Sequence, residues 1–255
     1  MRRIVGGGTM GMRGARKPAG HRTWLSLTDE FELVIHGREL ALPHSVERVV
    51  AFLGLSTQPV HRLKLAGALW PDVSEVQAAR SLRTALWRLQ RSGLPVVDVH
   101  EDRVALLPLV RVDVIELFAL CRELLDDRDA EALARVSDLI DSAELLPDWD
   151  DEWVVADRER FRMLRLEALE LAAERLIARA EHGRAIEAAL AATLSDPLRE
   201  SARRLVIRVH LAEGNVASAL RAYEDYRSLL DREIGVEPSF AMQRLMDPVE
   251  AVPVG

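Results

Sequence analysis

The stretch EVQAARSLRTALWRLQR, residues 75–91, decides how the N-terminal half of this sequence folds. Its apolar residues recur with the period of an α-helix, so they share one face. That face consists of Ala79, Leu82, Ala85, Leu86 and Leu89. The opposite face consists of Arg80, Thr84, Trp87, Arg88 and Arg91, with Arg83 on its flank. The pattern predicts an amphipathic helix that packs on a small core and exposes an arginine-rich surface.

The arginine-rich face has two interpretations. Four arginines and no acidic residue occupy positions 80–91. Arginine donates two parallel hydrogen bonds to a guanine edge or to a phosphate, so this face suits DNA. Charged helix faces are, however, usually just solvated. The helix alone leaves both interpretations open, and its neighbours in the sequence must decide between them.

The elements predicted around this helix favour DNA binding. Residues 23–42 alternate between apolar and polar positions, which predicts a small antiparallel sheet. Helices are expected over residues 46–55 and 61–69, and a β-hairpin is expected over residues 96–107, after the helix at 75–91. A sheet, three helices and a hairpin wing form the winged helix-turn-helix arrangement, whose recognition helix enters the major groove of DNA.

Three further basic residues fit this arrangement. Arg62 and Lys64 lie at the start of the second helix, the position that touches the DNA backbone in a helix-turn-helix. Arg103 lies in the predicted wing, from where it can reach a phosphate or the minor groove. Trp87 leaves two alternatives open, because its ring either packs against the wing or contacts DNA.

The C-terminal half is predicted to be almost entirely helical. Helices are expected over residues 113–126, 129–142, 152–181, 183–194, 197–212 and 215–233, with a short last helix from Ser239. Gly183 and Gly214 are interpreted as helix–helix turns, and their separation is near the roughly 34 residues of a tetratricopeptide repeat. We therefore expect a mainly α protein, in which an all-α, tetratricopeptide-like domain over residues 113–247 follows a winged helix-turn-helix domain over residues 23–112.

Charge is divided unevenly between these two halves. The chain of 255 residues carries a formal net charge of −7. Residues 1–112 hold 16 Lys and Arg against 10 Asp and Glu, whereas residues 113–255 hold 18 against 31. Phosphates repel an acidic surface, so only the first half is expected to contact DNA along its length.

Cysteine content and hydropathy limit the cellular environments in which this chain is expected. The one cysteine, Cys121, excludes an internal disulfide framework and lies in an apolar, helical setting typical of a buried thiol. No apolar run approaches the roughly 18 residues of a membrane span. We expect a cytoplasmic protein that has no membrane partner.

Both ends of the chain are expected to lie outside the two domains. Residues 1–22 are rich in glycine and basic side chains, and they are interpreted as a disordered arm. An alternative is that part of this arm only adds nonspecific affinity for phosphates. Residues 1–22 contain G-x-G-x-x-G at Gly6, Gly8 and Gly11, but the following MRGARKPAGH is not the helix that a dinucleotide site requires. Residues 248–255 are interpreted as a C-terminal tail.

No catalytic, cofactor or metal site is predicted. The sequence contains neither H-E-x-x-H nor G-x-S-x-G. Asp148, Asp150 and Asp151 cluster around Trp149, and they are interpreted as an N-terminal cap of the following long helix rather than as a metal or acid–base site. The protein is therefore expected not to be an enzyme and to need no cofactor.

Several motifs resemble a known family. In the first half they are LAGALWPD at 65–72 and AARSLRTALWRLQR at 78–91. In the second half they are VDV at 112–114, LLPDWDDEW at 145–153, ERFRMLRLEALE at 159–170, DPLRE at 196–200 and AEGNVASALRAYEDYRSLLDREIGVEPS at 212–239. These residues resemble the SARP family of bacterial transcriptional regulators (antibiotic regulatory proteins), which join an OmpR-type winged helix to a bacterial transcriptional activator domain.

The resemblance implies a sequence-specific activator that binds repeats in double-stranded promoter DNA and recruits RNA polymerase, and we expect a homodimer on DNA. The recognition-helix positions of the family correspond here to Arg80, Ser81, Arg83, Thr84, Trp87, Arg88 and Arg91. Many members begin this helix with Asn-Thr or Asn-Leu where this chain has Arg-Ser, so the target sequence stays open. The alternative is a protein-interaction adaptor whose winged helix no longer reads DNA.

Overall fold

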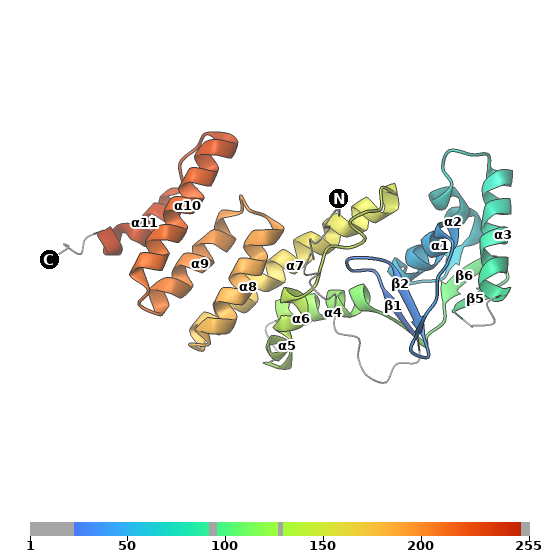
Figure 1. The fold of residues 1–255 in the computed structure, drawn as a ribbon, viewed down its shortest axis with the longest axis horizontal. Coiled ribbons are helices and arrows are strands. Elements are labelled where there is room, and N and C mark those ends of the chain that lie inside the picture. The colour runs from blue at the N-terminus through green and yellow to red at the C-terminus, as the bar shows by residue number, and fades with distance from the viewer. Residues whose placement is uncertain (1–22, 92–95, 127–129, 251–255) are drawn as a thin grey trace, which may run out of the picture. The chain divides into compact units, whose positions relative to one another are not determined.

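The computed structural model describes residues 23–91, 96–126 and 130–250, which form two compact units (Figure 1). The first unit contains Met1–Ile115 and Asp141–Val155, and the second contains Glu116–Ile140 and Ala156–Gly255. A small mixed sheet-and-helix region followed by helical repeats confirms the predicted fold class. The segment 141–155, expected in the C-terminal domain, lies within the first unit. The predicted arm at 1–22 lies outside the described residues.

The first unit combines two small sheets with three helices. Its elements are β1 (Thr23–Ser26), β2 (Glu32–Ile35), β3 (Arg38–Glu39), α1 (His44–Leu55), β4 (Val60–His61), α2 (Arg62–Leu69), α3 (Glu75–Arg91), β5 (Val97–His100), β6 (Arg103–Leu106) and β7 (Val110–Val112). One sheet has the order β3-β2-β1-β7, and β7 pairs parallel with β1. The other sheet has the order β4-β6-β5, in which the predicted hairpin β5–β6 forms the wing. The sequence analysis did not predict the short strands β4 and β7.

Helix α1 packs closely on the first sheet. It buries Val46, Val49, Val50 and Leu53. A Cβ atom at Gly54 would lie only 2.8 Å from Cδ2 of Leu25, so a larger residue there would force the side chain of Leu25 to shift. This contact fixes α1, on which α3 packs in turn.

Asp113 anchors the sheet to the start of α4 (Asp113–Leu125). This carboxylate is 1 % exposed and accepts hydrogen bonds from Ser26 Oγ, from the backbone N–H and the hydroxyl of Thr28, and from the backbone N–H groups of Leu27 and Val114. A buried carboxylate is tolerated only when it is bonded this fully. From the sequence, Asp113 was expected only to start a helix, and this role was not predicted.

The second unit consists of antiparallel helices. After α4 come α5 (Ala130–Ala134), α6 (Val136–Ile140), α7 (Glu152–Ala178), α8 (His182–Ser195), α9 (Glu200–Ala212), α10 (Val216–Ile234) and α11 (Phe240–Glu250). Helix α9 packs against both α8 and α10, which gives the stacked pairs of a helical repeat (Figure 1). Gly214 has a positive φ of 75° in the α9–α10 turn, as predicted. Gly183 instead lies inside α8, and Ala180, with φ of 57°, makes the preceding turn.

The prediction of one helix over residues 129–142 was wrong, because the segment forms the two short helices α5 and α6. The guanidinium of Arg184 donates hydrogen bonds to the carbonyls of Leu133 and Ala134 at the end of α5. Arg165 donates to the carbonyl of Leu139 near the end of α6. Arginines from distant helices thus satisfy carbonyl groups that a continuous helix would have used itself.

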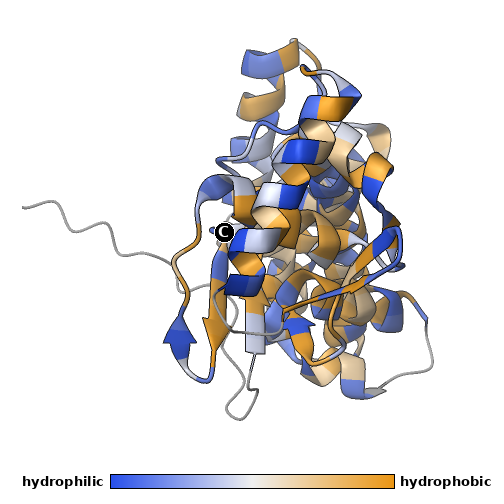
Figure 2. Ribbon diagram, turned by 90° about the vertical axis from the view of Figure 1, so that its right-hand side faces the viewer, coloured by the Kyte–Doolittle hydropathy of each residue, from blue (hydrophilic) through white to orange (hydrophobic). Residues whose placement is uncertain are grey.

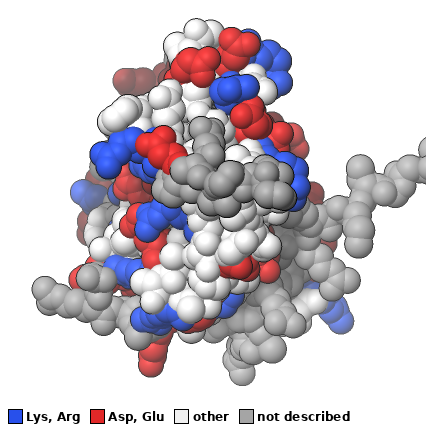
Figure 3. Space-filling view, turned by 90° about the vertical axis from the view of Figure 1, so that its left-hand side faces the viewer, with Lys and Arg blue, Asp and Glu red and all other residues white. Residues whose placement is uncertain are grey.

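Surface charges of both signs are interspersed on the face of the second unit that Figure 3 shows.

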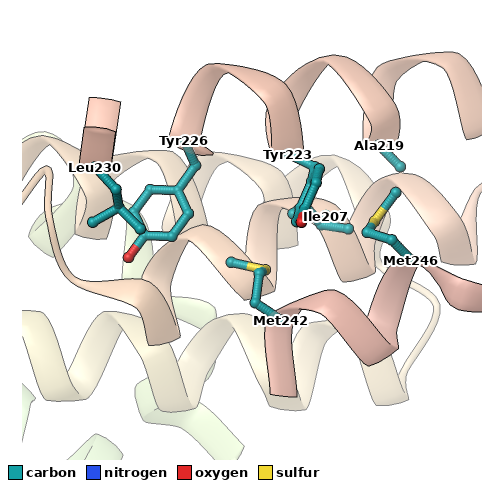
Figure 4. Close-up of a cluster of buried hydrophobic side chains, with 7 residues drawn as sticks. All are labelled: Ile207, Ala219, Tyr223, Tyr226, Leu230, Met242 and Met246. Atoms are coloured by element: carbon teal, nitrogen blue, oxygen red, sulfur yellow. The ribbon is translucent and has the colours of Figure 1, made fainter. Parts of the chain in front are cut away.

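Beneath the surface, α9, α10 and α11 share a compact apolar cluster (Figure 4), which consists of Ile207, Ala219, Tyr223, Tyr226, Leu230, Met242 and Met246. Tyr226 is 1 % exposed, and its hydroxyl donates a hydrogen bond to the carbonyl of Leu198. The cluster therefore holds α11 against the repeat. The hydroxyl of Tyr226 has a hydrogen-bond acceptor although its side chain is buried.

Cys121 lies in the interior of α4 with no exposed surface, as its sequence setting predicted. Burial raises the pKa of its thiol to about 12, although Arg165 and Arg122 oppose this shift. The thiolate, which is the reactive form, is therefore disfavoured in the folded protein.

Candidate nucleic-acid interface

A reciprocal capping arrangement sets the start of α3. Ser74 Oγ accepts a hydrogen bond from the backbone N–H of Gln77 at 3.4 Å, and Gln77 Oε1 accepts one from the backbone N–H of Ser74 at 3.4 Å. The helix then runs from Glu75 to Arg91, as predicted. Its buried residues are Ala78, Leu82, Ala85, Leu86 and Leu89. Ala78 takes the place on the inner face that the sequence analysis gave to Ala79, which is only half-buried.

The opposite face of α3 is open to solvent and carries most of the candidate residues. The exposed ones are Arg80, Arg83, Thr84, Trp87, Arg88 and Arg91, whereas Ser81 is half-buried. In Figure 2 the side of the first unit that carries α3 faces the viewer, and hydrophilic residues recur along the helix. One helix face therefore gathers four guanidinium groups, and the structure describes no acidic side chain among positions 80–91.

Trp87 projects from the middle of this face. Its side chain is 53 % exposed, so packing against the wing does not bury it. The guanidinium carbon of Arg91 lies 4.8 Å from the centroid of the indole ring, within the range of a cation–π interaction. The pair forms a flat, cationic surface one helical turn long.

The Thr84 hydroxyl is already engaged within the helix. It donates a hydrogen bond of 3.0 Å to the carbonyl oxygen of Arg80. Since a hydroxyl has one proton to donate, Thr84 offers an outside partner its methyl group and oxygen lone pairs only. This restricts what Thr84 can recognise to a methyl group or a hydrogen-bond donor.

The start of α2 is joined to the turn of the wing. The backbone N–H of Arg62 donates to the carbonyl of Asp102 at 2.7 Å. The ring of His61 spans the same junction, since Nδ1 accepts from the backbone N–H of Leu63 at 3.2 Å and Nε2 lies 2.8 Å from Asp102 Oδ2. These contacts place the wing beside the first turn of α2. The role of His61 was not predicted, and nothing in the local sequence signals it.

The three basic candidates outside α3 all lie near this junction. Lys64 is exposed and Arg62 is half-buried. The Nε atom of Arg62 is buried and has no hydrogen-bond partner among the described residues. Arg103 is exposed at the start of β6, and its Nη1 donates to the carbonyl of Pro59 at 3.0 Å. The candidates of the α2 start and of the wing are thus brought together by the fold.

The acidic residues before α7 were interpreted as an N-terminal cap of that helix, and the structure agrees with this only in part. The carboxylate of Asp151 pairs with the guanidinium of Arg48 instead of capping the helix, and its backbone carbonyl accepts from the N–H groups of Val154 and Val155. Asp148 and Asp150 are exposed. Within the described ranges, no group of three or more His, Cys, Asp or Glu residues is arranged to hold a metal ion.

Among the helices that the structure describes, none combines the length and the apolar character needed to cross a bilayer.

Comparison with known proteins agrees with this architecture. Residues 122–249 match the bacterial transcriptional activator domain. The chain is 30 % identical over 197 residues to the regulatory protein AfsR of Streptomyces coelicolor, which covers 73 % of this chain but 20 % of AfsR. The structure also resembles that of Mycobacterium tuberculosis EmbR in complex with a low-affinity phosphopeptide, with a TM-score of 0.68 and 21 % identity, over 92 % of this chain and 66 % of EmbR.

A winged helix followed by a helical repeat domain defines a class of transcriptional regulators rather than a class of enzymes. The chain belongs to the SARP family, whose members carry the bacterial transcriptional activator domain. It spans about a fifth of the length of AfsR, so what that longer protein does as a whole is not transferred to this chain.

Proposed function

We propose that this transcriptional regulator binds double-stranded promoter DNA in a sequence-specific manner and that α3 is its recognition helix. The observation that carries the proposal is the solvent-exposed face of α3, on which four arginines surround Thr84 and Trp87. A helix of this diameter fits the major groove, and arginine reads guanine through its O6 and N7 atoms. In this proposal the middle of the face, at Arg83, Thr84, Trp87 and Arg88, reaches base edges.

The surrounding basic residues complete the proposed interface. Arg80 and Arg91 lie nearer the ends of α3, where phosphates are closer, and Ser81 follows Arg80. Arg62 and Lys64 at the start of α2 contact the backbone of the same groove. Arg103 in the wing reaches a phosphate or the adjacent minor groove. The unpartnered Nε of Arg62 supports this, because a phosphate oxygen would supply its missing acceptor.

The family membership supports activation as the outcome of binding. We propose that the chain acts in the cytoplasm as a homodimer on promoter repeats and that it recruits RNA polymerase. The acidic second unit takes no part in contacting DNA, because phosphates would repel it.

The test is a selection of bound sequences from a random duplex pool by the full chain, followed by gel-shift titration of the selected duplex. Arg83→Ala and Arg88→Ala are each expected to weaken binding by about 1–3 kcal/mol. Arg227→Ala is the matched control, since Arg227 is an exposed arginine on α10 of the second unit. Failure to enrich any sequence, or full binding by both α3 variants, would refute α3 as the reader and favour the adaptor alternative.

A further inference from the structure

A groove of about 960 Å³ lies within the first unit. One wall is formed by residues 67–73, which are the end of α2 and the turn that follows it, and the other by residues 148–153. His44 and Arg48 of α1 form its floor. None of the ten residues proposed to contact DNA is among the described residues that line it. The groove is therefore available for a different partner.

The groove carries an excess of negative charge on both walls. Its carboxylates are those of Asp72, Asp148, Asp150, Asp151 and Glu152, whereas Arg48 is its one arginine. Asp151 and Arg48 form an ion pair, so these two charges cancel. The other four carboxylates are exposed to solvent. A concave surface with this charge attracts cations and repels nucleic acid.

The floor shows how this groove holds a guanidinium group. Nε of Arg48 donates to Asp151 Oδ1 at 2.9 Å, and a terminal nitrogen donates to the carbonyl of Leu69. The guanidinium carbon also lies 5.9 Å from the centroid of the Trp70 ring. A carboxylate, a carbonyl and an indole ring thus surround one arginine, an arrangement that suits the planar, delocalised cation of arginine better than lysine.

The opposite wall offers the same kinds of group, an indole ring and carboxylates. Trp149 is only half-buried, and its ring is held by contacts with Phe31 at 6.1 Å, His44 at 4.9 Å and Trp153 at 6.2 Å between centroids. Its sequence neighbours Asp148 and Asp150 are both exposed. A fixed aromatic ring flanked by carboxylates is a ready site for a second guanidinium.

The indole N–H of Trp153 is a donor that an acceptor on a bound partner would satisfy. Trp153 also lines the groove, and its Nε1 atom is buried without a hydrogen-bond partner among the described residues. Buried donors normally find an acceptor, and a peptide main chain carries one carbonyl per residue. A peptide therefore supplies both groups that the groove lacks, the cation and the acceptor.

We propose that this groove binds a segment of a partner protein that carries closely spaced arginine side chains. The four exposed carboxylates lie on two walls, so several separated charges match them better than one compact ion does. The described residues offer no set of three or more ligands for a metal ion, which agrees with a distributed cation. The proposal is independent of DNA binding by α3.

The experiment measures binding of a short fluorescent peptide that alternates arginine and alanine to the full chain, by fluorescence anisotropy. Control peptides carry glutamine or lysine in place of arginine. We expect the glutamine peptide not to bind and the lysine peptide to bind several-fold more weakly than the arginine peptide. Equal binding of the lysine and arginine peptides would overturn the assignment of a guanidinium site.

A double variant localises the binding. Asp148→Asn combined with Asp150→Asn removes two groove charges without changing side-chain size and is expected to weaken peptide binding about tenfold. Asp225→Asn combined with Asp231→Asn removes the same charge from exposed positions of α10 and should leave binding unchanged. Equal losses in both double variants would show general electrostatic attraction and would overturn the assignment of peptide binding to the groove.

A chain without residues 1–22 distinguishes an internal occupant from an external one. These residues carry six Lys and Arg and no Asp or Glu, so they could compete for the groove. We expect the shortened chain to bind the arginine peptide as the full chain does. A tenfold gain in affinity on removing residues 1–22 would show that the chain's own arm fills the groove. It would overturn the proposal that the occupant is a segment of a partner protein.

Discussion

Nε2 of His61 lies 2.8 Å from a carboxylate oxygen of Asp102, so one imidazole ring joins the start of α2 to the turn of the wing. The other ring nitrogen accepts the backbone N–H of Leu63, which caps α2. This pair of bonds assigns the neutral tautomer that carries its proton on Nε2. Where the wing stands relative to the helix-turn-helix therefore depends on a side chain outside α3.

His61→Asn separates the two roles of this ring. Asparagine is a good N-cap and keeps the bond to Leu63, but it is too short to reach Asp102. Because both partners are well exposed, we expect a loss of no more than about 1 kcal/mol in the free energy of unfolding. DNA affinity is expected to fall about twofold at every sequence, because the wing loses one of its contacts with α2 while the β4–β6 pairing and the backbone bond from Arg62 to Asp102 remain. Unchanged affinity in a gel shift, with normal melting, would show that the ring does not position the wing.

Arginines on α3 and at the start of α2 should differ in what their loss does to binding. Arg83→Ala is expected to cost about 1–3 kcal/mol and to relax the preference at one base position. Arg62→Ala or Lys64→Ala should weaken all sequences alike and reduce the slope of log affinity against log salt by about one unit. Titrations of the selected and a scrambled duplex at several salt concentrations distinguish the two. A salt slope that is unaltered by Arg62→Ala would remove this residue from the interface.

The hydrogen bond that the Thr84 hydroxyl makes within α3 predicts which group of a base this side chain contacts. Its proton is donated to the carbonyl of Arg80, so its methyl group is expected to contact the methyl group of a thymine. Thr84→Val keeps that methyl group and should bind nearly as wild type, whereas Thr84→Ser should lose about 0.8 kcal/mol, the value of one buried methyl group.

Replacing the thymine with deoxyuridine provides the complementary measurement for Thr84. It should weaken the wild-type chain by the same amount as Thr84→Ser and should not weaken the serine variant further. If Thr84→Val abolished binding and Thr84→Ser did not, the hydroxyl would be the group that contacts the base, and the methyl contact would be wrong.

The sequence predicted α3 because all its signals are local. The spacing of Leu82, Leu86 and Leu89 gives its inner face, and the arginines mark its outer face. Features that depend on distant partners were not predictable in this way. Strand β7 exists because it pairs with β1, and α5 ends where Arg184 of α8 reaches its carbonyls. The link between His61 and Asp102 likewise needs the wing to fold back onto α2.

Cys121 is expected to resist alkylation in the folded chain. Burial raises its pKa to about 12, so at pH 8 the thiolate fraction is about 10³-fold lower than that of a free cysteine. Reaction with iodoacetamide should therefore be slow in buffer and should accelerate in urea as the chain unfolds. Because Cys121 is the only cysteine, the labelled fraction reports on this site alone. Rapid labelling without denaturant would contradict its burial.

Asp113 is expected to be the residue of the first unit whose replacement is least tolerated. Its Oδ1 accepts from the N–H groups of Leu27 at 2.9 Å and Val114 at 2.6 Å, and its Oδ2 accepts from Thr28 N–H at 3.1 Å. Asp113→Ala leaves these buried donors without an acceptor and is expected to lower the free energy of unfolding by at least about 3 kcal/mol. The measurement is chemical denaturation of the full chain.

Asp113→Asn refines this test, since asparagine has nearly the same shape. Its oxygen can still serve Leu27 and Val114, and the hydroxyls of Ser26 and Thr28 can rotate to accept from its amide. The backbone N–H of Thr28 cannot rotate, so it would face another donor, and we expect a loss of about 2 kcal/mol. Asp225→Asn on the exposed side of α10 is the control and should leave stability unchanged within about 0.5 kcal/mol. If Asp113→Asn were as harmless as this control, the carboxylate would not be what ties β1 to the start of α4.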